Sequence, residues 1–122
     1  MDYRADDLRQ RRVRGPLMAS DIGERFVAIV NGAETEAFLD MFISGGFVDD
    51  WGRTFTGRKE IKGWSDDEFI GAAGRLTKVD ISSTDGATTV TGLWTSRRHT
   101  GPSRFVLVHA GDQLASMRIT AA

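Results

Sequence analysis

The chain has 122 residues, a formal net charge of −1 and no cysteine. This length fits one domain with a single core, and the near-neutral charge gives no general attraction to nucleic acid or to an acidic membrane. Without cysteine there is no disulfide, thiolate metal site or cysteine nucleophile, which agrees with a reducing cytoplasm. No apolar run is long enough to span a bilayer. We therefore expect a cytoplasmic protein that binds neither nucleic acid nor membrane.

Residues 1–17 differ from the rest because they carry five arginines among three aspartates and lack an apolar stretch. A signal peptide needs such a stretch after its positive region, so this segment is not one. One interpretation is a basic arm that binds a partner. The other, which we favour, is an arginine-rich extension that is flexible or weakly helical. The folded domain is then expected over residues 18–122.

Two helices are predicted first. Apolar residues recur at helical spacing after Ser20, a candidate N-cap, and the pair Asn31-Gly32 favours a left-handed C-cap. A second helix is expected over 33–43, and Gly45-Gly46 then breaks it.

A short strand and a third helix follow. The strand begins at Phe47, its candidate hairpin partner is 53–55, and Gly57 starts the helix. Ser65 with Glu68 matches a capping box, which predicts that a new helical turn starts there.

From Arg75 onward the pattern changes to alternation interrupted by turn signals. Helices followed by a run of antiparallel strands indicate an α+β fold, with helices on one face of a curved sheet. The predicted strands are 76–83, 88–98, 103–109 and 113–120, with turns at 84–86, 100–102 and 110–112.

The order and spacing of these segments resemble the nuclear transport factor 2-like superfamily, specifically its polyketide-cyclase-like (SnoaL-like) bacterial branch. After the two-helix opening, the resemblance is carried by Phe47-Val-Asp-Asp-Trp-Gly52, by Phe55-Thr-Gly57 with Ile61 and Trp64, by Gly101-Pro102 with Phe105, and by Met117-Arg-Ile119. It covers nearly all of 20–120. It implies a cone of three N-terminal helices and a strongly curved antiparallel sheet around one deep pocket. It also implies a homodimer through the outer face of the sheet.

Two adjacent carboxylates, Asp49 and Asp50, end the short strand beside Trp51. Strand alternation sends neighbouring side chains to opposite faces, so only one of the pair points into the pocket. A carboxylate whose charged form is disfavoured by apolar neighbours is a candidate general acid or base. The alternative is a strand-end residue that bonds to the backbone of the next turn.

The resemblance selects Asp50 as the catalytic candidate. Val48-Asp49-Asp50 matches a Val–acidic–Asp sequence whose last aspartate shuttles the proton in ketosteroid-isomerase-like members. Asp49 is then expected on the outer side of the strand or paired with Arg53 or Arg58, unless a bulge exchanges the two roles.

The same resemblance argues against the isomerase reaction itself. It puts Phe26 and Ser103 at the positions where those isomerases polarise a carbonyl with a tyrosine and a protonated aspartic acid. A phenyl ring donates no hydrogen bond, and serine is a much weaker acid. Because electrostatic stabilisation is commonly the larger contribution to the rate, ketosteroid isomerase activity is not expected.

The aromatic and methionine side chains favour either an apolar ligand pocket or an ordinary filled core. Alternation assigns five strand residues to the concave face, namely Trp94, Phe105, Leu107, Met117 and Ile119, with Phe26, Trp51 and Trp64 approaching from the helices. On the opposite face, apolar side chains lie among threonines and arginines, which predicts that a second copy covers it. These apolar residues are Leu93, Val106, Val108 and Leu114.

The two histidines, His99 and His109, are expected at the surface, and neither has a partner at metal-ligand spacing. We therefore expect no metal and no cofactor. The leading hypothesis is a cofactor-independent acid–base enzyme (isomerase, cyclase or dehydratase type) for an apolar or polycyclic substrate, with Asp50 as the proton-transfer residue. The alternatives are a non-catalytic binder of a small apolar ligand and a dimeric assembly or regulatory subunit. The candidate ligand-binding residues are Phe26, Asp49, Trp51, Trp64, Trp94, Ser103, Phe105 and Met117.

Overall fold

A computed structural model describes the backbone of residues 19–122 and the side chains from Ile22 onward. The predictions for residues 1–17, for the domain start at 18 and for the Ser20 side chain lie outside this range. Within it, no helix is long and apolar enough to cross a membrane.

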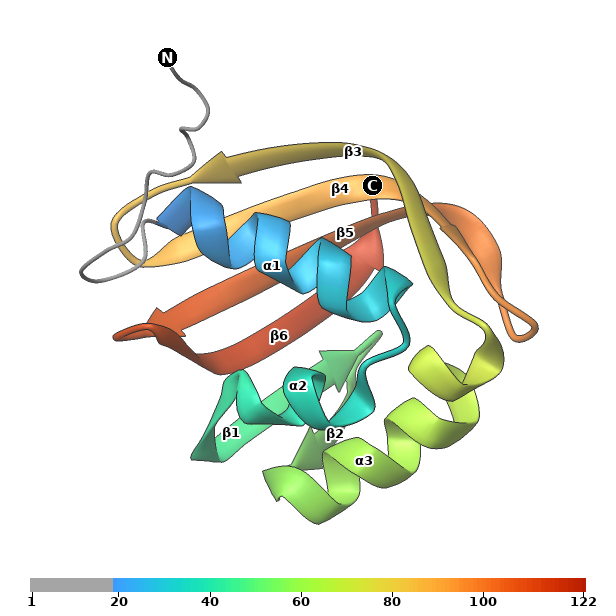
Figure 1. The fold of residues 1–122 in the computed structure, drawn as a ribbon, viewed down its shortest axis with the longest axis horizontal. Helices are drawn as coiled ribbons and strands as arrows, with labels where there is room; N and C mark the ends of the chain where they lie inside the picture. Colours follow the sequence, from blue (N-terminus) through green and yellow to red (C-terminus); the bar gives the residue numbers. More distant parts are fainter. Residues whose placement is uncertain (1–18) are drawn as a thin grey trace.

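Three α-helices lie on one side of a curved sheet, as Figure 1 shows. The apolar face of the first helix packs against the sheet, and Phe26 on it is fully buried. The close approach requires a glycine, because a Cβ on Gly23 would lie 2.8 Å from Ile81 Cγ2. The helical elements are α1 (Ala19–Asn31), α2 (Thr35–Asp40), α3 (Gly57–Glu68) and the 3₁₀ turn η2 (Ile70–Ala72).

The six strands form one sheet in the order β2-β1-β6-β5-β4-β3. Four pairs of strands that follow one another in sequence are antiparallel, whereas β1 and β6 pair parallel. The strands are β1 (Phe42–Asp50), β2 (Arg53–Thr56), β3 (Arg75–Ser83), β4 (Ala87–Thr95), β5 (Thr100–Ala110) and β6 (Gln113–Ala121). The α+β class and the curved sheet under three helices are confirmed, but the sheet is mixed rather than wholly antiparallel.

The predicted concave face is confirmed. Trp94, Phe105, Leu107, Met117 and Ile119 are all buried, with at most 6 % of their surface exposed. Each such side chain stabilises the fold by about 1.5–3 kcal/mol relative to an exposed one.

The assignment of Leu114 to the outer face was wrong. Its side chain is fully buried, because the β5–β6 register pairs Val108 with Ser116 and then His109 with Leu114. This shift skips Ala115 and reverses the alternation. Val108 stays on the outer face, where 38 % of it is exposed.

The second helix is shorter than the 33–43 predicted from its apolar spacing. It ends at Asp40, and β1 starts at Phe42 because this segment pairs with Leu114 on β6. The Gly45-Gly46 pair lies at the resulting bulge inside β1. The left-handed residue after α1 is Ala33. Asn31 instead links α1 to β3, because its side chain bonds to both the N–H and the C=O of Leu76.

Two further local predictions were wrong. Helix α3 runs through Ser65 without restarting, and the buried Ser65 hydroxyl accepts a bond from the N–H of Ile70 at 3.4 Å. The turn expected at 100–102 lies at 96–99. There the Ser96 hydroxyl accepts hydrogen bonds from the backbone N–H groups of Arg98 and His99. β5 therefore begins at Thr100.

Candidate functional site

A cavity of about 470 Å³ opens where the ends of β1, β4, β5 and β6 meet α3. Its size lies within the ~300–1,000 Å³ typical of small-molecule sites. The apolar part of its lining comes from large side chains, namely Trp51, Trp64, Phe69, Trp94, Phe105 and Ile119. The polar part consists of Asp50, Arg53, Glu68, Arg98, His99 and Ser103.

Asp50 lies at the end of β1 and lines this cavity, with 14 % of its side chain exposed. One carboxylate oxygen, Oδ2, accepts hydrogen bonds from Trp64 Nε1 at 3.1 Å and from Arg53 Nη2 at 2.5 Å. Within residues 22–122, the other oxygen, Oδ1, accepts no hydrogen bond from a side chain. The carboxylate is thus oriented through one of its two oxygens.

Arg53 is held between two carboxylates. The hairpin pairs Asp50 directly with Arg53 across the strands, and Glu68 reaches the same guanidinium from the end of α3. Glu68 accepts two bonds from it, at 2.7 Å and 3.1 Å, which is the bidentate geometry that suits arginine. The hydrogen bonds that Arg53 donates to Glu68, and then the one that it donates to Asp50, raise the pKa of Arg53, while the Arg53 hydrogen bonds lower the pKa of Glu68. Both groups of this pair therefore keep their charge near neutral pH.

A stack of four aromatic rings lies at the cavity, and three of them, Trp64, Phe69 and Trp94, line it. Phe55, Trp64, Phe69 and Trp94 follow one another with centroid distances of 5.8, 4.8 and 4.7 Å and interplanar angles of 24° or less. Phe105 meets Trp94 edge-on, with centroids 6.0 Å apart. Such contacts add about 0.5–1.5 kcal/mol each beyond the area that they bury. The part of the cavity lining that the stack supplies is therefore apolar.

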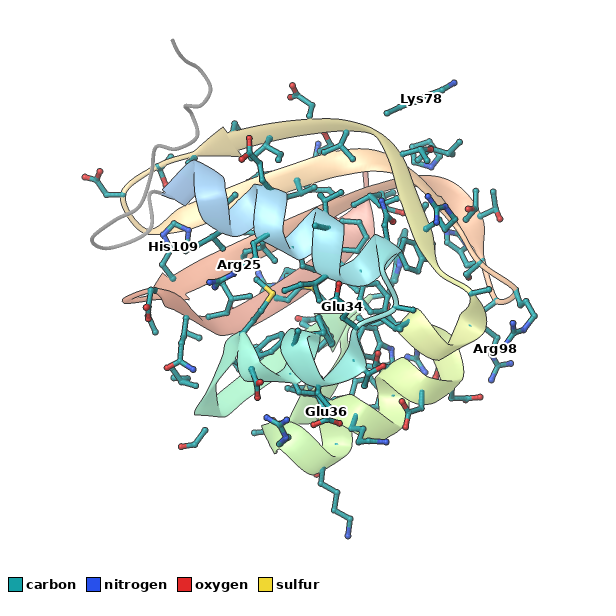
Figure 2. The ribbon with its side chains drawn as sticks, in the orientation of Figure 1. Arg25, Glu34, Glu36, Lys78, Arg98 and His109 are labelled. Carbon is teal, nitrogen blue, oxygen red and sulfur yellow. The ribbon has the colours of Figure 1, made fainter. Side chains whose placement is uncertain are left out.

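The cavity mouth carries more charge than its depth. Arg98 donates to Asp67 Oδ2 at 2.8 Å and lies in the β4–β5 turn, near the end of α3 (Figure 2). The exposed ring of His99 meets Trp51 edge-on, with centroids 6.4 Å apart and planes at 73°. His109 lies at the other end of β5 (Figure 2), where its Nε2 is 2.7 Å from Thr88 Oγ1.

Five of the eight candidate ligand-binding residues line the cavity, together with the catalytic candidate Asp50. Two others, Phe26 and Met117, are fully buried and do not line it, because they pack in the core beneath the cavity wall. Phe26 meets Phe105 with ring centroids 5.5 Å apart. The Ser103 hydroxyl lines the cavity and donates to the carbonyl of Gly101 at 3.1 Å.

Asp49, which the sequence placed among the candidate ligand-binding residues, does not line the cavity. As alternation requires, it points away from Asp50 and pairs with Arg118 at 3.2 Å, not with Arg53 or Arg58. β1 and β6 run parallel with Asp49 opposite Arg118, which local sequence does not reveal. Asp49 also accepts the N–H of Gly52 at 2.8 Å and so fixes the turn beside the site.

Sequence reasoning missed five cavity residues, namely Arg53, Glu68, Phe69, Arg98 and His99. Two of them carried a usable signal. A two-residue hairpin loop puts Asp50 opposite Arg53 on one face, and Glu68 follows Trp64 by four residues on α3. His99 was expected merely at the surface; it is exposed, yet it also lines the cavity. Residues 22–122 contain no group of three or more His, Asp or Glu side chains able to hold a metal ion.

No family model matches the sequence, and no curated protein matches it either. Solved structures do match. A candidate polyketide cyclase from Sinorhizobium meliloti is 15% identical, with a TM-score of 0.73 over 85% of this chain and 100% of that chain. SalBIII is an epoxide hydrolase/cyclase-like enzyme with a role in pyran ring formation in the polyether salinomycin. It is 15% identical, with a TM-score of 0.74 over 85% of this chain and 90% of that chain.

A third match has a ketosteroid isomerase-like fold, comes from Catenulispora acidiphila and was solved in complex with trimethylamine. It is 19% identical, with a TM-score of 0.66 over 86% of this chain and 88% of that chain. These likenesses confirm, at the level of the fold, the resemblance inferred from the sequence. The chain has the nuclear transport factor 2-like fold that polyketide-cyclase-like and ketosteroid isomerase-like proteins share.

Proposed function

We propose that this protein is a cytoplasmic, cofactor-independent enzyme that moves a proton on an apolar or polycyclic small molecule held in the cavity. The observation that carries the proposal is the Asp50 carboxylate, which lines an aromatic cavity with Oδ2 bonded to Arg53 and Trp64 and with Oδ1 open. A ligand C–H next to a carbonyl group would meet that open oxygen. Isomerisation, cyclisation and dehydration all use such a transfer.

The polar groups around Asp50 favour an enzyme over a passive binder. A binder of apolar ligands needs few polar groups, whereas this cavity is also lined by Arg53, Glu68, Arg98 and His99. When Asp50 takes a proton, negative charge develops on the ligand's oxygen. Arg98 and His99 at the mouth are the candidate donors to that charge. The match to cyclase-type proteins of the same fold supports this reaction class.

The second candidate function is a non-catalytic binder of a small apolar ligand. It is favoured by Phe26, which is buried outside the cavity, and by Ser103, whose hydroxyl already bonds to Gly101. Neither residue supplies the strong hydrogen-bond donor to a carbonyl that isomerases of this fold use at the matching position.

Hydrogen–deuterium exchange distinguishes the two candidates without knowledge of the natural substrate. The probe is 2-tetralone, an apolar bicyclic ketone, whose exchange next to the carbonyl in D₂O is followed by proton NMR. Asp50→Asn keeps the shape of the side chain and removes the base. We expect protein-dependent exchange to fall by about 10²–10⁴-fold. Asp49→Asn, on the adjacent residue outside the cavity, is the control and should exchange like the unsubstituted protein. Equal exchange in both variants would refute the role of Asp50.

A further inference from the structure

Trp51 occupies a position in a two-residue hairpin turn that does not favour tryptophan. It lies between the paired residues Asp50 and Arg53 and has a φ of 54°, followed by Gly52 at 93°. Two positive φ values favour Asn-Gly or Asp-Gly, and a bulky side chain at the first position is strained. Folding alone therefore favours a small polar residue here.

The exposure of Trp51 is equally unfavourable for the isolated fold. Of its surface, 56 % is exposed, the largest value among the large hydrophobic residues of the described range. Tryptophan is enriched at binding surfaces, where a ligand or partner covers the ring. The exposed indole lines the cavity described above.

The backbone beneath the indole is fixed. The N–H of Trp51 donates to the carbonyl of Ile119 at 3.2 Å, and the N–H of Gly52 donates to Asp49 Oδ1 at 2.8 Å. The two residues that flank the turn, Asp50 and Arg53, form an ion pair with each other. These hydrogen bonds hold the backbone of the turn in place and leave the exposed indole of Trp51 lining the cavity, with its ring plane at 73° to that of His99.

We propose that Trp51 is a specificity-determining residue that covers a planar, unsaturated ring system bound in the cavity. This inference rests on the proposed function and adds the shape of the ligand. The lining on the aromatic stack, which includes Trp64 and Trp94, is apolar as well. A planar unsaturated ring can stack on the exposed indole of Trp51, whereas a puckered saturated ring of equal size cannot.

The test uses two probes that differ only in saturation, 2-naphthol and decahydro-2-naphthol, with binding measured by isothermal titration calorimetry. The unsubstituted protein should bind 2-naphthol roughly tenfold more tightly, because ring contacts of this kind contribute on that scale. Trp51→Asn introduces the residue that the turn favours. It should remove most of this preference while the melting temperature stays the same or rises. Trp51→Phe should restore the preference in part, since a phenyl ring still stacks.

Three results would overturn the inference. Equal affinity of the unsubstituted protein for the two probes would remove the preference for planarity. An unchanged affinity for 2-naphthol in Trp51→Asn would show that the indole does not cover the ligand. A change in the sedimentation behaviour of Trp51→Asn would show that a second copy covers the ring instead. Ile43→Asn, at an exposed apolar residue outside the cavity, is the control and should bind both probes normally.

The 2-tetralone exchange assay separates this inference from the proposed function. If Asp50→Asn abolishes exchange while Trp51→Asn leaves the probe preference intact, the proton-transfer role stands and the role of Trp51 fails. If Trp51→Asn removes the preference while Asp50→Asn exchanges normally, the protein is a selective binder of planar ligands.

Discussion

Replacing Trp64 by phenylalanine tests the hydrogen bond that orients the carboxylate of Asp50. The indole is 4 % exposed, and its Nε1 donates to Asp50 Oδ2 at 3.1 Å. A hydrogen bond to a charged group contributes about 1.5–3 kcal/mol, and the lower value applies here because Arg53 still holds the same oxygen. The smaller ring also loses roughly two buried carbons, or about 1.5 kcal/mol. The free energy of unfolding should therefore fall by about 3 kcal/mol.

Trp94→Phe is the matched control. Trp94 is 5 % exposed and stacks on the same Phe69 ring, but in the range 22–122 its indole N–H donates to no side chain or turn carbonyl. This variant should lose only the packing contribution, about 1.5 kcal/mol. Urea unfolding of both variants gives the difference directly. Equal losses would mean that the Trp64–Asp50 hydrogen bond contributes nothing in solution, and the orientation argument for Asp50 would fail with it.

Two further predictions concern the Glu68–Arg53 pair and the outer face of the sheet. The hydrogen bond from Arg53 lowers the pKa of Glu68 from its usual 4.5, so the stability from this pair is present above that pH and lost as the pH falls through the lower, folded-state value. Melting temperatures measured between pH 7 and 3 should therefore fall less in Glu68→Gln than in the unsubstituted protein. On the outer face, we propose that a second copy covers Val108, which is 38 % exposed. Val108→Glu should convert a dimer into a monomer in sedimentation velocity experiments.

Each of these predictions has a control. Glu24→Gln, on the exposed side of α1, should leave the pH dependence of the melting temperature unchanged. If Glu68→Gln gives a curve parallel to that of the unsubstituted protein, the pair does not form in solution. Ile43→Glu introduces the same charge at another exposed apolar residue, 37 % exposed, on β1 instead of β5. A stable monomer in the unsubstituted protein would refute the dimer.

Local patterns predicted most of the fold correctly. Alternation assigned Trp94, Phe105 and Met117 to the buried face, and helical spacing found α1 and α3. The errors lie where contacts between distant segments override local preference. Phe42 joined a strand rather than a helix because it pairs with β6, and Leu114 turned inward because β6 contains a bulge.

The candidate site likewise contains residues that local sequence predicts and residues that only long-range contacts determine. Asp50 could be selected from alternation and resemblance, because both depend on residues close in sequence. The Asp49–Arg118 pair depends on the parallel β1–β6 register, over 69 residues of chain, and had no local signal. The cavity contribution of His99 required the position of the β4–β5 turn, which was predicted four residues too late.

A crystal structure of the protein with 2-naphthol bound tests the role of Asp50 most directly. We predict that the ring lies in the cavity beside Trp51, with the ring carbon next to the hydroxyl about 3–3.5 Å from Asp50 Oδ1 and the hydroxyl directed toward Arg98 or His99. A ring bound outside the cavity, or one whose hydroxyl-bearing edge points away from both Asp50 and the Arg98–His99 segment, would contradict the assignment of Asp50 as the group that exchanges a proton with the ligand.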